Sequence, residues 1–336
     1  MQYREENKAW ESARCEYVDG LNELIKNRAS KLDAERHKNA SSIFNEPERF
    51  RNMLRNMLGW PLNEAVARVV PEIVMQKLGN EGDISIYRVR ISIFDELTLN
   101  GIYFTHDDAQ KRPLVIAQHG GYGTPEFASG FINGDSANYN GMVDEILKYD
   151  VDVFAPQLLL WDVDRFGAKY DRSTIDKKLK HMGSSVFAVE VYAIIRAIDC
   201  FESKGYTSFG MVGLSYGSQY TILTTAIDTR IRSCIASCSF TDRNQYDWAD
   251  WLWFDSASKL HDAETVCLIY PRKIRIQIGD NDSIFNSEYG KREYDVLKKL
   301  CENVDMDWCE FTVFDGVHEF YHGNDAVKHL IEDISK

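Results

Sequence analysis

The chain has 336 residues, enough for one large core plus an extension, and its hydrophobic (44%) and charged (27%) fractions are those of an ordinary globular protein. Its formal net charge of -13 argues against a nucleic-acid partner, because phosphate binding needs a local surplus of lysine and arginine, and it also disfavours anionic membrane surfaces. The longest uncharged stretch, residues 205–227, is broken up by Gly, Ser, Thr and Gln, so it is too polar to cross a bilayer and no membrane partner is expected.

Residues 1–82 are expected to form a helical N-terminal extension that packs on the core. Two apolar stripes at three- and four-residue spacing support this prediction, because such stripes normally bury against a neighbouring element. The first stripe comprises Trp10, Ala13, Tyr17, Leu21, Leu24 and Ile25, and the second comprises Phe50, Met53, Leu54, Met57 and Leu58. Gly59 followed by Pro61 should end the second helix. An independent binding module is the alternative reading of this segment.

From residue 83 to residue 336 the pattern predicts a single α/β domain. Residues 85–91 and 97–104 alternate with period two and should form an antiparallel pair at a sheet edge. Helical patterns such as 186–201 and 287–300 then alternate with short apolar runs, which lie at 114–117, 151–155, 209–212, 231–236, 274–278 and 309–314. Such alternation indicates βα units, so we expect a mostly parallel eight-stranded sheet flanked by helices.

A sharp turn is expected after the run at 209–212, in the sequence Gly213-Leu214-Ser215-Tyr216-Gly217. Glycines on both sides of a serine let strand and helix approach closely, and this arrangement exposes the hydroxyl at the carboxyl end of the sheet, where open α/β folds bind ligands. A Gly-x-Ser-x-Gly match alone is weak, since both residues are common. The strand-turn-helix context favours Ser215 as a nucleophile over a purely structural turn.

A serine nucleophile needs a base that is itself oriented by an acid, and in folds of this kind the acid and then the histidine follow the serine in the chain. The run at 274–278 leads into Asp280 and Asp282, of which Asp282 is the preferred acid; Asp280 is the alternative, and either could be a turn residue. The run at 309–314 leads into His318, which is preferred as the base over His322 because it lies closer to the strand end.

The loop Gln118-His119-Gly120-Gly121-Tyr122-Gly123 directly follows the run at 114–117. Small residues at this place allow backbone N–H groups to point at a substrate oxyanion, and each such donor is typically worth about 3 kcal/mol in the transition state. We assign the two donors to Gly121, with Tyr122 as the alternative, and to Tyr216. His119 is expected to support the loop. This chemistry needs no metal or organic cofactor, and the sequence has no H-E-x-x-H, Walker or G-x-G-x-x-G motif.

The N-terminus and the cysteines predict the cellular compartment. The first ten residues are charged and lack the apolar stretch of a secretory signal. The seven cysteines are an odd number without metal-ligand spacing, and Cys234 and Cys238 fall in or near an expected buried strand. These features favour a bacterial cytoplasmic protein without disulfides.

Four stretches of the chain resemble the bacterial dienelactone-hydrolase-like and acetylxylan-esterase-like branch of the α/β-hydrolases. They are His119-Gly120-Gly121, residues 155–161 (APQLLLW), residues 213–218 (GLSYGS) and Pro271-Arg272-Lys273. The resemblance covers roughly residues 80–335 and, less specifically, residues 57–61. It implies a serine esterase that acts on a small-molecule or oligosaccharide ester, often an acetyl or related ester on plant-polysaccharide fragments. Dienelactone hydrolases themselves use a cysteine nucleophile, so the serine at position 215 argues against their own reaction.

Tyr122, Trp161 and Arg172 are the candidate substrate-binding residues, because they lie on or just after elements that should end near the pocket. The aromatic stretch at 246–254 falls within a possible cap at 240–265, where its rings could stack on sugars, although core packing is favoured for most of them. One alternative function is a serine peptidase of the prolyl-oligopeptidase type, which usually carries a propeller that this sequence lacks. Another is a non-catalytic binding protein on a hydrolase fold. A homo-oligomer stays possible.

Overall fold

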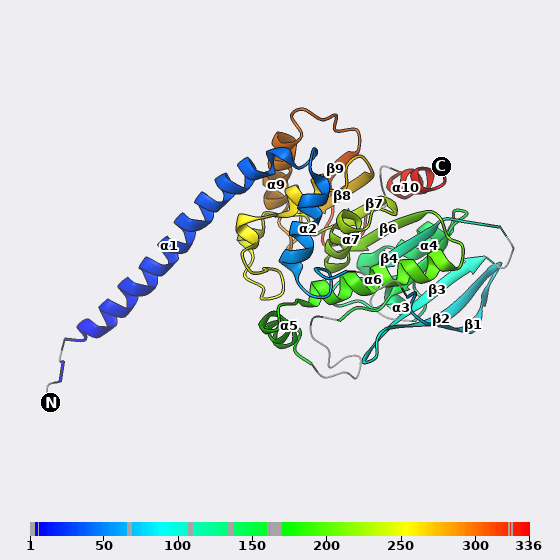
Figure 1. Cartoon of the computed structure of the whole chain (residues 1–336), viewed down its shortest axis with the longest axis horizontal. Coiled ribbons are helices and arrows are strands. Elements are labelled where there is room, and N and C mark those ends of the chain that lie inside the picture. The colour runs from blue at the N-terminus through cyan, green and yellow to red at the C-terminus, as the bar shows by residue number, and fades with distance from the viewer. Residues whose placement is uncertain are drawn as a thin grey trace.

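The computed structural model describes residues 4–5, 7–65, 69–106, 110–132, 137–159, 161, 170–321, 323 and 325–336. Nine strands form one sheet in the order β1-β2-β3-β5-β4-β6-β7-β8-β9 (Figure 1). Their bounds are β1 Ile73–Glu81, β2 Ile84–Phe94, β3 Leu97–His106, β4 Leu114–Gln118, β5 Asp152–Pro156, β6 Phe209–Leu214, β7 Ile231–Ser237, β8 Lys273–Gly279 and β9 Cys309–Phe314. The ladders from β1 to β5 are antiparallel, and those from β5 through β4 to β9 are parallel.

The α/β class and the mostly parallel sheet are confirmed, but the expected number of eight strands is wrong. The additional strand is β1, which lies within the segment expected to be helical, so the sheet begins at Ile73. β1 pairs only with β2 and most of its residues are exposed, because it is the edge of the sheet. An exposed edge strand needs few apolar residues, so it gives little of the alternation that identifies half-buried strands.

Helices cover both faces of the sheet. Alternate residues of a central strand enter different cores: Leu114 and Ile116 of β4 face one, and Val115 and Ala117 face the other. The first core is covered by α2 Pro47–Leu58, α6 Val186–Ser203, α7 Tyr216–Ile227, α8 Asp262–Cys267 and α9 Ser287–Leu300. The second is covered by α3 Pro125–Ala128, α4 Met142–Leu147 and α10 Ala326–Ile334. This three-layer packing explains why the central strands read as continuous apolar runs.

The two N-terminal helices differ in how they meet this body. α2 buries Phe50, Leu54 and Met57, and Arg51 donates to the carbonyls of Ala226 (3.0 Å) and Leu268 (2.9 Å). By contrast, α1 (Ala9–Asn39) projects away from the body and its residues 9–28 are all exposed (Figure 1). The expectation that its apolar stripe packs on the core is therefore not met within this chain. Only the C-terminal end of the helix is anchored, through the buried Arg36.

The remaining helical elements are α5 Arg172–His181 and the 3-10 turns η1 Ala40–Ser42, η2 Ala137–Tyr139, η3 Arg243–Gln245 and η4 Ser256–Ser258. None of the helices in the described part of the chain has the length and apolar character needed to cross a membrane. All seven cysteines are free thiols, and six of them are buried. The loops that follow β4, β6, β8 and β9 gather at the carboxyl ends of the parallel strands, where the candidate site lies.

Candidate active site

Ser215 occupies a tight turn between β6 and α7. Its backbone has φ 60° and ψ -123°, which is a strained conformation for a residue with a side chain. A Cβ on Gly213 would lie 2.2 Å from the carbonyl oxygen of Gly217, and a Cβ on Gly217 would lie 2.3 Å from that of Gln118. Both flanking glycines are therefore required by close backbone approach. The Ser215 N–H donates to Ser237 O at 2.8 Å, which ties the turn to the end of β7.

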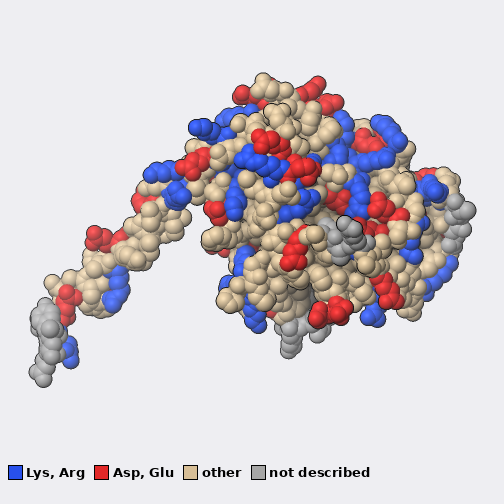
Figure 2. Space-filling view, viewed as in Figure 1, with Lys and Arg blue, Asp and Glu red and all other residues tan. Residues whose placement is uncertain are grey.

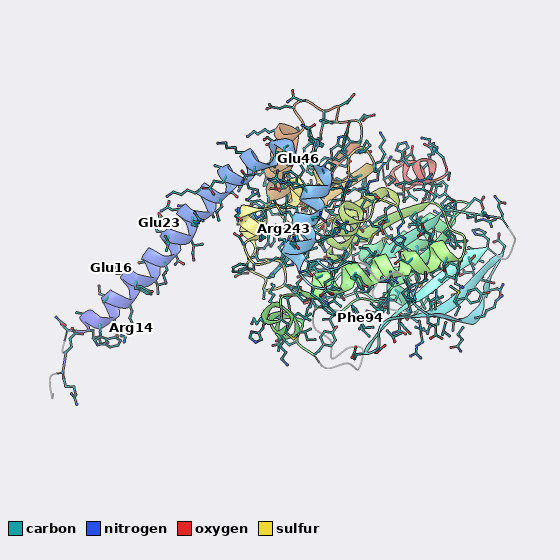
Figure 3. The ribbon with its side chains drawn as sticks, viewed as in Figure 1. Arg14, Glu16, Glu23, Glu46, Phe94 and Arg243 are labelled. Atoms are coloured by element: carbon teal, nitrogen blue, oxygen red, sulfur yellow. The ribbon has the colours of Figure 1, made fainter. Side chains whose placement is uncertain are left out.

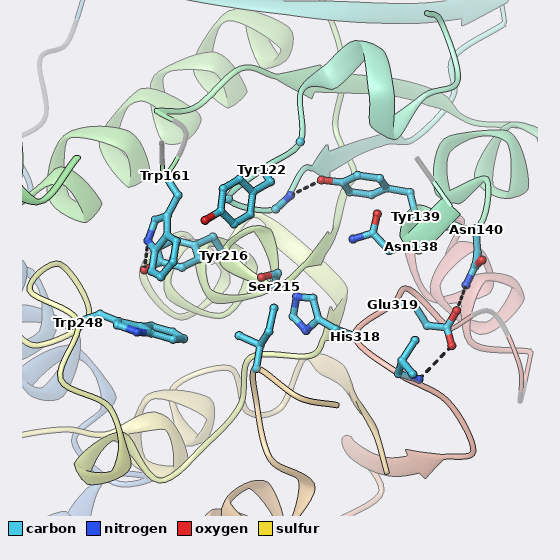
Figure 4. Close-up of a pocket in the computed structure, with 15 residues that line it drawn as sticks. Tyr122, Asn138, Tyr139, Asn140, Trp161, Ser215, Tyr216, Trp248, His318 and Glu319 are labelled. Carbon is cyan, nitrogen blue, oxygen red and sulfur yellow. Dashed lines mark hydrogen bonds between the residues drawn. The ribbon is translucent and has the colours of Figure 1, made fainter. Parts of the chain in front are cut away.

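The acid loop after β8 and the histidine loop after β9 meet beside this turn. His318 Nδ1 lies 2.8 Å from Asp282 Oδ2, and Asp282 Oδ1 accepts the N–H groups of Ile284 and Phe285, both at 2.8 Å. The imidazole faces the Ser215 hydroxyl across the pocket floor (Figure 4). The alternative acid, Asp280, is exposed and its Oδ1 accepts the Gly316 N–H at 3.1 Å. The alternative base, His322, lies outside the described residues.

Cys238, directly after β7, lies beside His318 and Asp282. The sequence predicted it only as a buried residue in or near a strand. It also has a positive φ of 60°, and its Sγ donates to Glu319 O at 3.4 Å. Cys238, Asp282 and His318 bring three potential metal-binding atoms within 4.8 Å of one another. Burial and the nearby Asp282 raise the pKa of the Cys238 thiol, so this residue is a neutral thiol beneath the carboxylate.

The glycine-rich loop after β4 lies on the other side of Ser215. His119 is buried, its Nδ1–H donates to Gly120 O at 2.8 Å, and its Nε2 accepts the Leu158 N–H at 3.0 Å. Burial lowers the pKa of His119 to about 4, so the ring is neutral at pH 7 and supports the loop as expected. A Cβ on Gly121 would lie 3.5 Å from the Tyr216 ring, so the two predicted donor residues are adjacent.

A cavity of about 560 Å³ opens above Ser215, and five of its fifteen lining residues are tyrosine or tryptophan (Figure 4). Trp161 contributes one wall, with its Nε1–H donating to Tyr216 Oη at 2.7 Å. Tyr122 lies 5.9 Å from Trp161 and is exposed at the rim, and Trp248 lies 5.2 Å from Trp161, as measured between ring centroids. The volume lies within the range of small-molecule binding pockets.

Arg172, one of the three candidate substrate-binding residues, is not among the residues that line the cavity. Its guanidinium is buried behind Tyr216, where Nε lies 2.6 Å from Asp250 Oδ2 and Nη1 lies 3.3 Å from Glu190 Oε2. The sequence offered this arginine as a substrate-binding candidate, but the pattern could not indicate that its side chain points to the interior, against the Tyr216 ring. Two buried carboxylates supply the compensation that a buried cation requires.

Several cavity residues carry no signal in the sequence. Tyr139, in η2, accepts the Gly120 N–H at 2.8 Å, and its hydroxyl occupies the space that a side chain at Gly123 would need. Glu319 lies next to His318 and accepts from Asn140 Nδ2 at 2.8 Å. Trp248 belongs to the aromatic stretch at 246–254, whose Trp251 and Trp253 are buried as expected of core residues. Of this group only Trp248 could have been suspected, from its place in that stretch.

Comparison with solved structures identifies esterases as structural neighbours of the chain. A Bacteroides fragilis NCTC 9343 protein classed by inference as an acetyl xylan esterase has a TM-score of 0.67 and 14% identity, covering 88% of this chain and 83% of that chain. A glucuronoyl esterase from Solibacter usitatus has a TM-score of 0.60 and 12% identity over 86% and 91% of the two chains. Acetyl Xylan Esterase 1 from Thermoanaerobacterium sp. JW/SL YS485 has a TM-score of 0.53 and 12% identity over 85% and 93%.

No protein-family model and no curated protein matches the sequence. The structural likeness at this low identity establishes the fold, which is the α/β-hydrolase fold, and confirms at that level the resemblance to acetylxylan-esterase-like proteins.

Proposed function

We propose that the chain is a serine esterase that hydrolyses carboxylic esters through an acyl-enzyme on Ser215. The observation that supports this best is the arrangement on the pocket floor. Ser215 faces His318, and the far nitrogen of that imidazole lies 2.8 Å from the buried carboxylate of Asp282. Activation of a serine requires this spatial order: a hydroxyl beside a base, and the base held by an acid.

In the proposed reaction His318 Nε2 takes the Ser215 proton while Oγ forms a bond to the ester carbonyl carbon. Asp282 holds the imidazole by accepting its Nδ1–H and stabilises the cation that forms. Collapse of the tetrahedral intermediate breaks the bond to the alcohol, which leaves with the proton from His318. Water then repeats the sequence and releases the carboxylic acid, so that the enzyme returns to its starting state.

The buried His119 supports Gly121 as one oxyanion donor. Gly120 O points inward to accept the Nδ1–H of His119, at 2.8 Å. Because the C=O and N–H of one trans peptide point in opposite directions, the Gly121 N–H points the other way, to the side of the cavity that Gly121 lines. The Gly121 carbonyl accepts the Trp161 N–H at 2.8 Å, which holds the next peptide plane as well. Tyr216 N–H, at the start of α7, is the proposed second donor.

The cavity wall supports an uncharged ester, and an acetyl or related ester of a carbohydrate is the favoured class. Trp161 and Trp248 lie nearly perpendicular to each other (82°), so they form a corner that can hold a sugar ring or an acyl chain. The carbohydrate esterases among the structural neighbours point to the same class.

The test is an ester panel of acetyl, longer acyl, feruloyl and glucuronoyl esters, together with a proline anilide, on wild type and Ser215→Ala. We expect turnover of short neutral esters that is lost in Ser215→Ala and kept in Ser283→Ala, a control in the exposed part of the acid loop. A fluorophosphonate should add its mass to Ser215 alone. Turnover of the anilide but of no ester would favour the peptidase, and failure to label Ser215 would favour a non-catalytic binding protein.

A further inference from the structure

No described residue of the body packs against the free part of α1, residues 9–28. The C-terminal end of α1 is held by Arg36, whose Nε lies 3.1 Å from Glu264 Oε1 and whose Nη1 donates to Ala257 O at 2.7 Å. Beyond this anchor, towards the N-terminus, residues 9–28 form more than five helical turns that are exposed on every side (Figures 1 and 3). The helix is therefore supported at one end only.

A solitary helix of this length is marginal in water, because most helical stability in proteins comes from tertiary packing. Gly20 lies at its centre, where glycine costs about 1 kcal/mol relative to alanine. The helix also exposes large apolar side chains: Trp10 is 47% exposed, Tyr17 69% and Ile25 65%. We call the set Trp10, Tyr17, Val18, Leu21, Leu24 and Ile25 the α1 stripe. Exposed apolar surface of this extent is typical of an interaction site.

The position of the α1 stripe on the helix defines one face. Trp10, Tyr17, Leu21 and Leu24 follow one another at intervals of seven, four and three residues, the spacing of a seam between two paired helices. Val18 and Ile25 widen this seam on one side. Glu16 and Glu23 point away from the side on which Arg14 lies (Figure 3), and Figure 2 shows uncharged surface between the charged groups along the helix.

The charges of the free helix are separated along its length. Residues 11–23 carry four carboxylates and a single arginine, whereas residues 26–31 carry Lys26, Arg28 and Lys31 and no carboxylate. A second copy of the same helix running antiparallel would bring the acidic segment of each onto the basic segment of the other. A parallel copy would bring like charges together, which is destabilising. This self-complementarity identifies the occupant of the stripe as another α1.

We infer that two copies of this chain form a dimer through antiparallel pairing of their α1 helices, with the two-fold axis near Leu21. In this register Tyr17 of one copy faces Ile25 of the other, and Arg14 lies opposite Arg28. The acidic segment of each copy as a whole runs alongside the basic segment of the other. The contact is isologous and closed, so it yields a dimer and no fibre.

The first experiment measures the mass of the full-length protein by sedimentation equilibrium over a range of concentrations. Wild type should have twice the mass of the chain. Leu21→Asp should be monomeric, because it places two carboxylates opposite each other at the axis. Ser12→Asp adds the same charge on the opposite face of α1 and should stay dimeric. Ester turnover and circular dichroism of each variant report that the body is folded. A monomeric wild type, or a Leu21→Asp variant that is still dimeric, would overturn the inference.

The second experiment tests the orientation. The pair Glu11→Lys and Glu16→Lys should weaken the dimer, as should the pair Lys26→Glu and Lys31→Glu, because each leaves the acidic and basic segments with net charges of the same sign. All four changes together restore complementarity with the signs exchanged, so the dimer should return. If the fourfold variant is no tighter than the two pairs, the helices do not pair antiparallel. Because the readout is mass, failure here leaves the proposed esterase activity untouched.

Discussion

Two residues that directly follow neighbouring strands, Ser215 after β6 and Cys238 after β7, have positive φ angles although neither is glycine. Strain of this kind costs about 1–3 kcal/mol per residue and persists where the surrounding structure fixes it, commonly at functional sites. The turn at Ser215 was predictable because its two glycines mark it in the sequence. The turn at Cys238 was not, since nothing in its local sequence distinguishes it from the buried strand before it.

The assignment of the acid can be tested with a matched pair of variants. Asp282→Asn keeps the shape of the side chain but replaces the carboxylate that faces His318 with an amide, so kcat should fall by about 10⁴-fold. Asp280→Asn alters an exposed group bonded to Gly316 N and should change kcat only a few-fold. Steady-state kinetics on the best ester of the panel provide the measurement. Equal losses in the two variants would reverse the assignment.

His119 predicts how stability depends on pH. Its folded pKa of about 4 lies below the unfolded value of about 6.5, so between these pH values the unfolded chain binds a proton that the native chain does not. The free energy of unfolding should therefore fall by about 3 kcal/mol from this residue as the pH drops from 6.5 to 4. Urea unfolding of wild type and His119→Gln at several pH values in this range isolates the effect. The free energy of unfolding of the variant should change less with pH than that of wild type, and an equal change in the two proteins would contradict the prediction.

At the scale of single elements, the junction after α2 shows how a glycine can be fixed by its surroundings. Gly59 has φ 97°, and a Cβ there would lie 2.4 Å from Gly183 O. Gly205 has nearly the same φ, 101°, but has no atom within 4 Å of the added Cβ. Gly59→Ala should lower the free energy of unfolding by more than the roughly 1 kcal/mol expected for Gly205→Ala, which carries backbone strain alone. Thermal and urea unfolding of the two variants provide the measurement. If both lose the same free energy of unfolding, the backbone around residue 59 shifts to make room for the added Cβ.

Arg172 joins α5 to α6 and to the aromatic segment through Glu190 and Asp250. Arg172→Met should destabilise the fold by about 3–5 kcal/mol, because it leaves two buried carboxylates without their cation. Arg172→Lys keeps the charge but not the forked geometry and should lose less. Urea unfolding at pH 7 measures both. A neutral effect of Arg172→Met would show that the carboxylates find other partners.

The elements best predicted from the sequence are those buried on both faces. The apolar runs at 114–117 and 209–212 became β4 Leu114–Gln118 and β6 Phe209–Leu214, because continuous burial leaves a continuous pattern. β1 and the turn η2, which carries Tyr139, were not foreseen. The first is an exposed edge, and the second is irregular backbone whose place is set by tertiary contacts.

At the scale of the whole molecule, the sequence predicted a sheet flanked by helices, but it did not predict which apolar helix faces are covered within this chain. The stripe of α1 was read as a helix face that packs on the core; the helix is present, but residues 9–28 are exposed. Periodicity alone cannot tell whether the neighbour of such a face belongs to the same chain. The strand-end loops were easier to place, because parallel strands bring their carboxyl ends to one edge of the sheet regardless of their separation in the chain.

Hydrogen exchange of the full-length protein can test the state of α1 in solution. In the inferred dimer, amides of residues 9–28 should be protected, whereas in Leu21→Asp they should exchange as a marginal helix does. The amides of β4 and β6 should be equally protected in both proteins, since the body does not depend on the contact. Rapid exchange of residues 9–28 in wild type would argue against a paired helix.

The pocket wall is connected to the interior by a chain of hydrogen bonds. Trp161 donates to Tyr216, Tyr216 donates to Asp250, and Asp250 accepts from Arg172. A substitution at Trp161 that widens the cavity therefore also removes a donor from Tyr216 and disturbs a buried ion pair behind it. Laboratory evolution of new substrate selectivity should therefore show strong epistasis at this wall. Beneficial substitutions of Trp161 would be tolerated only after compensating substitutions around Asp250 and Arg172, which do not line the cavity.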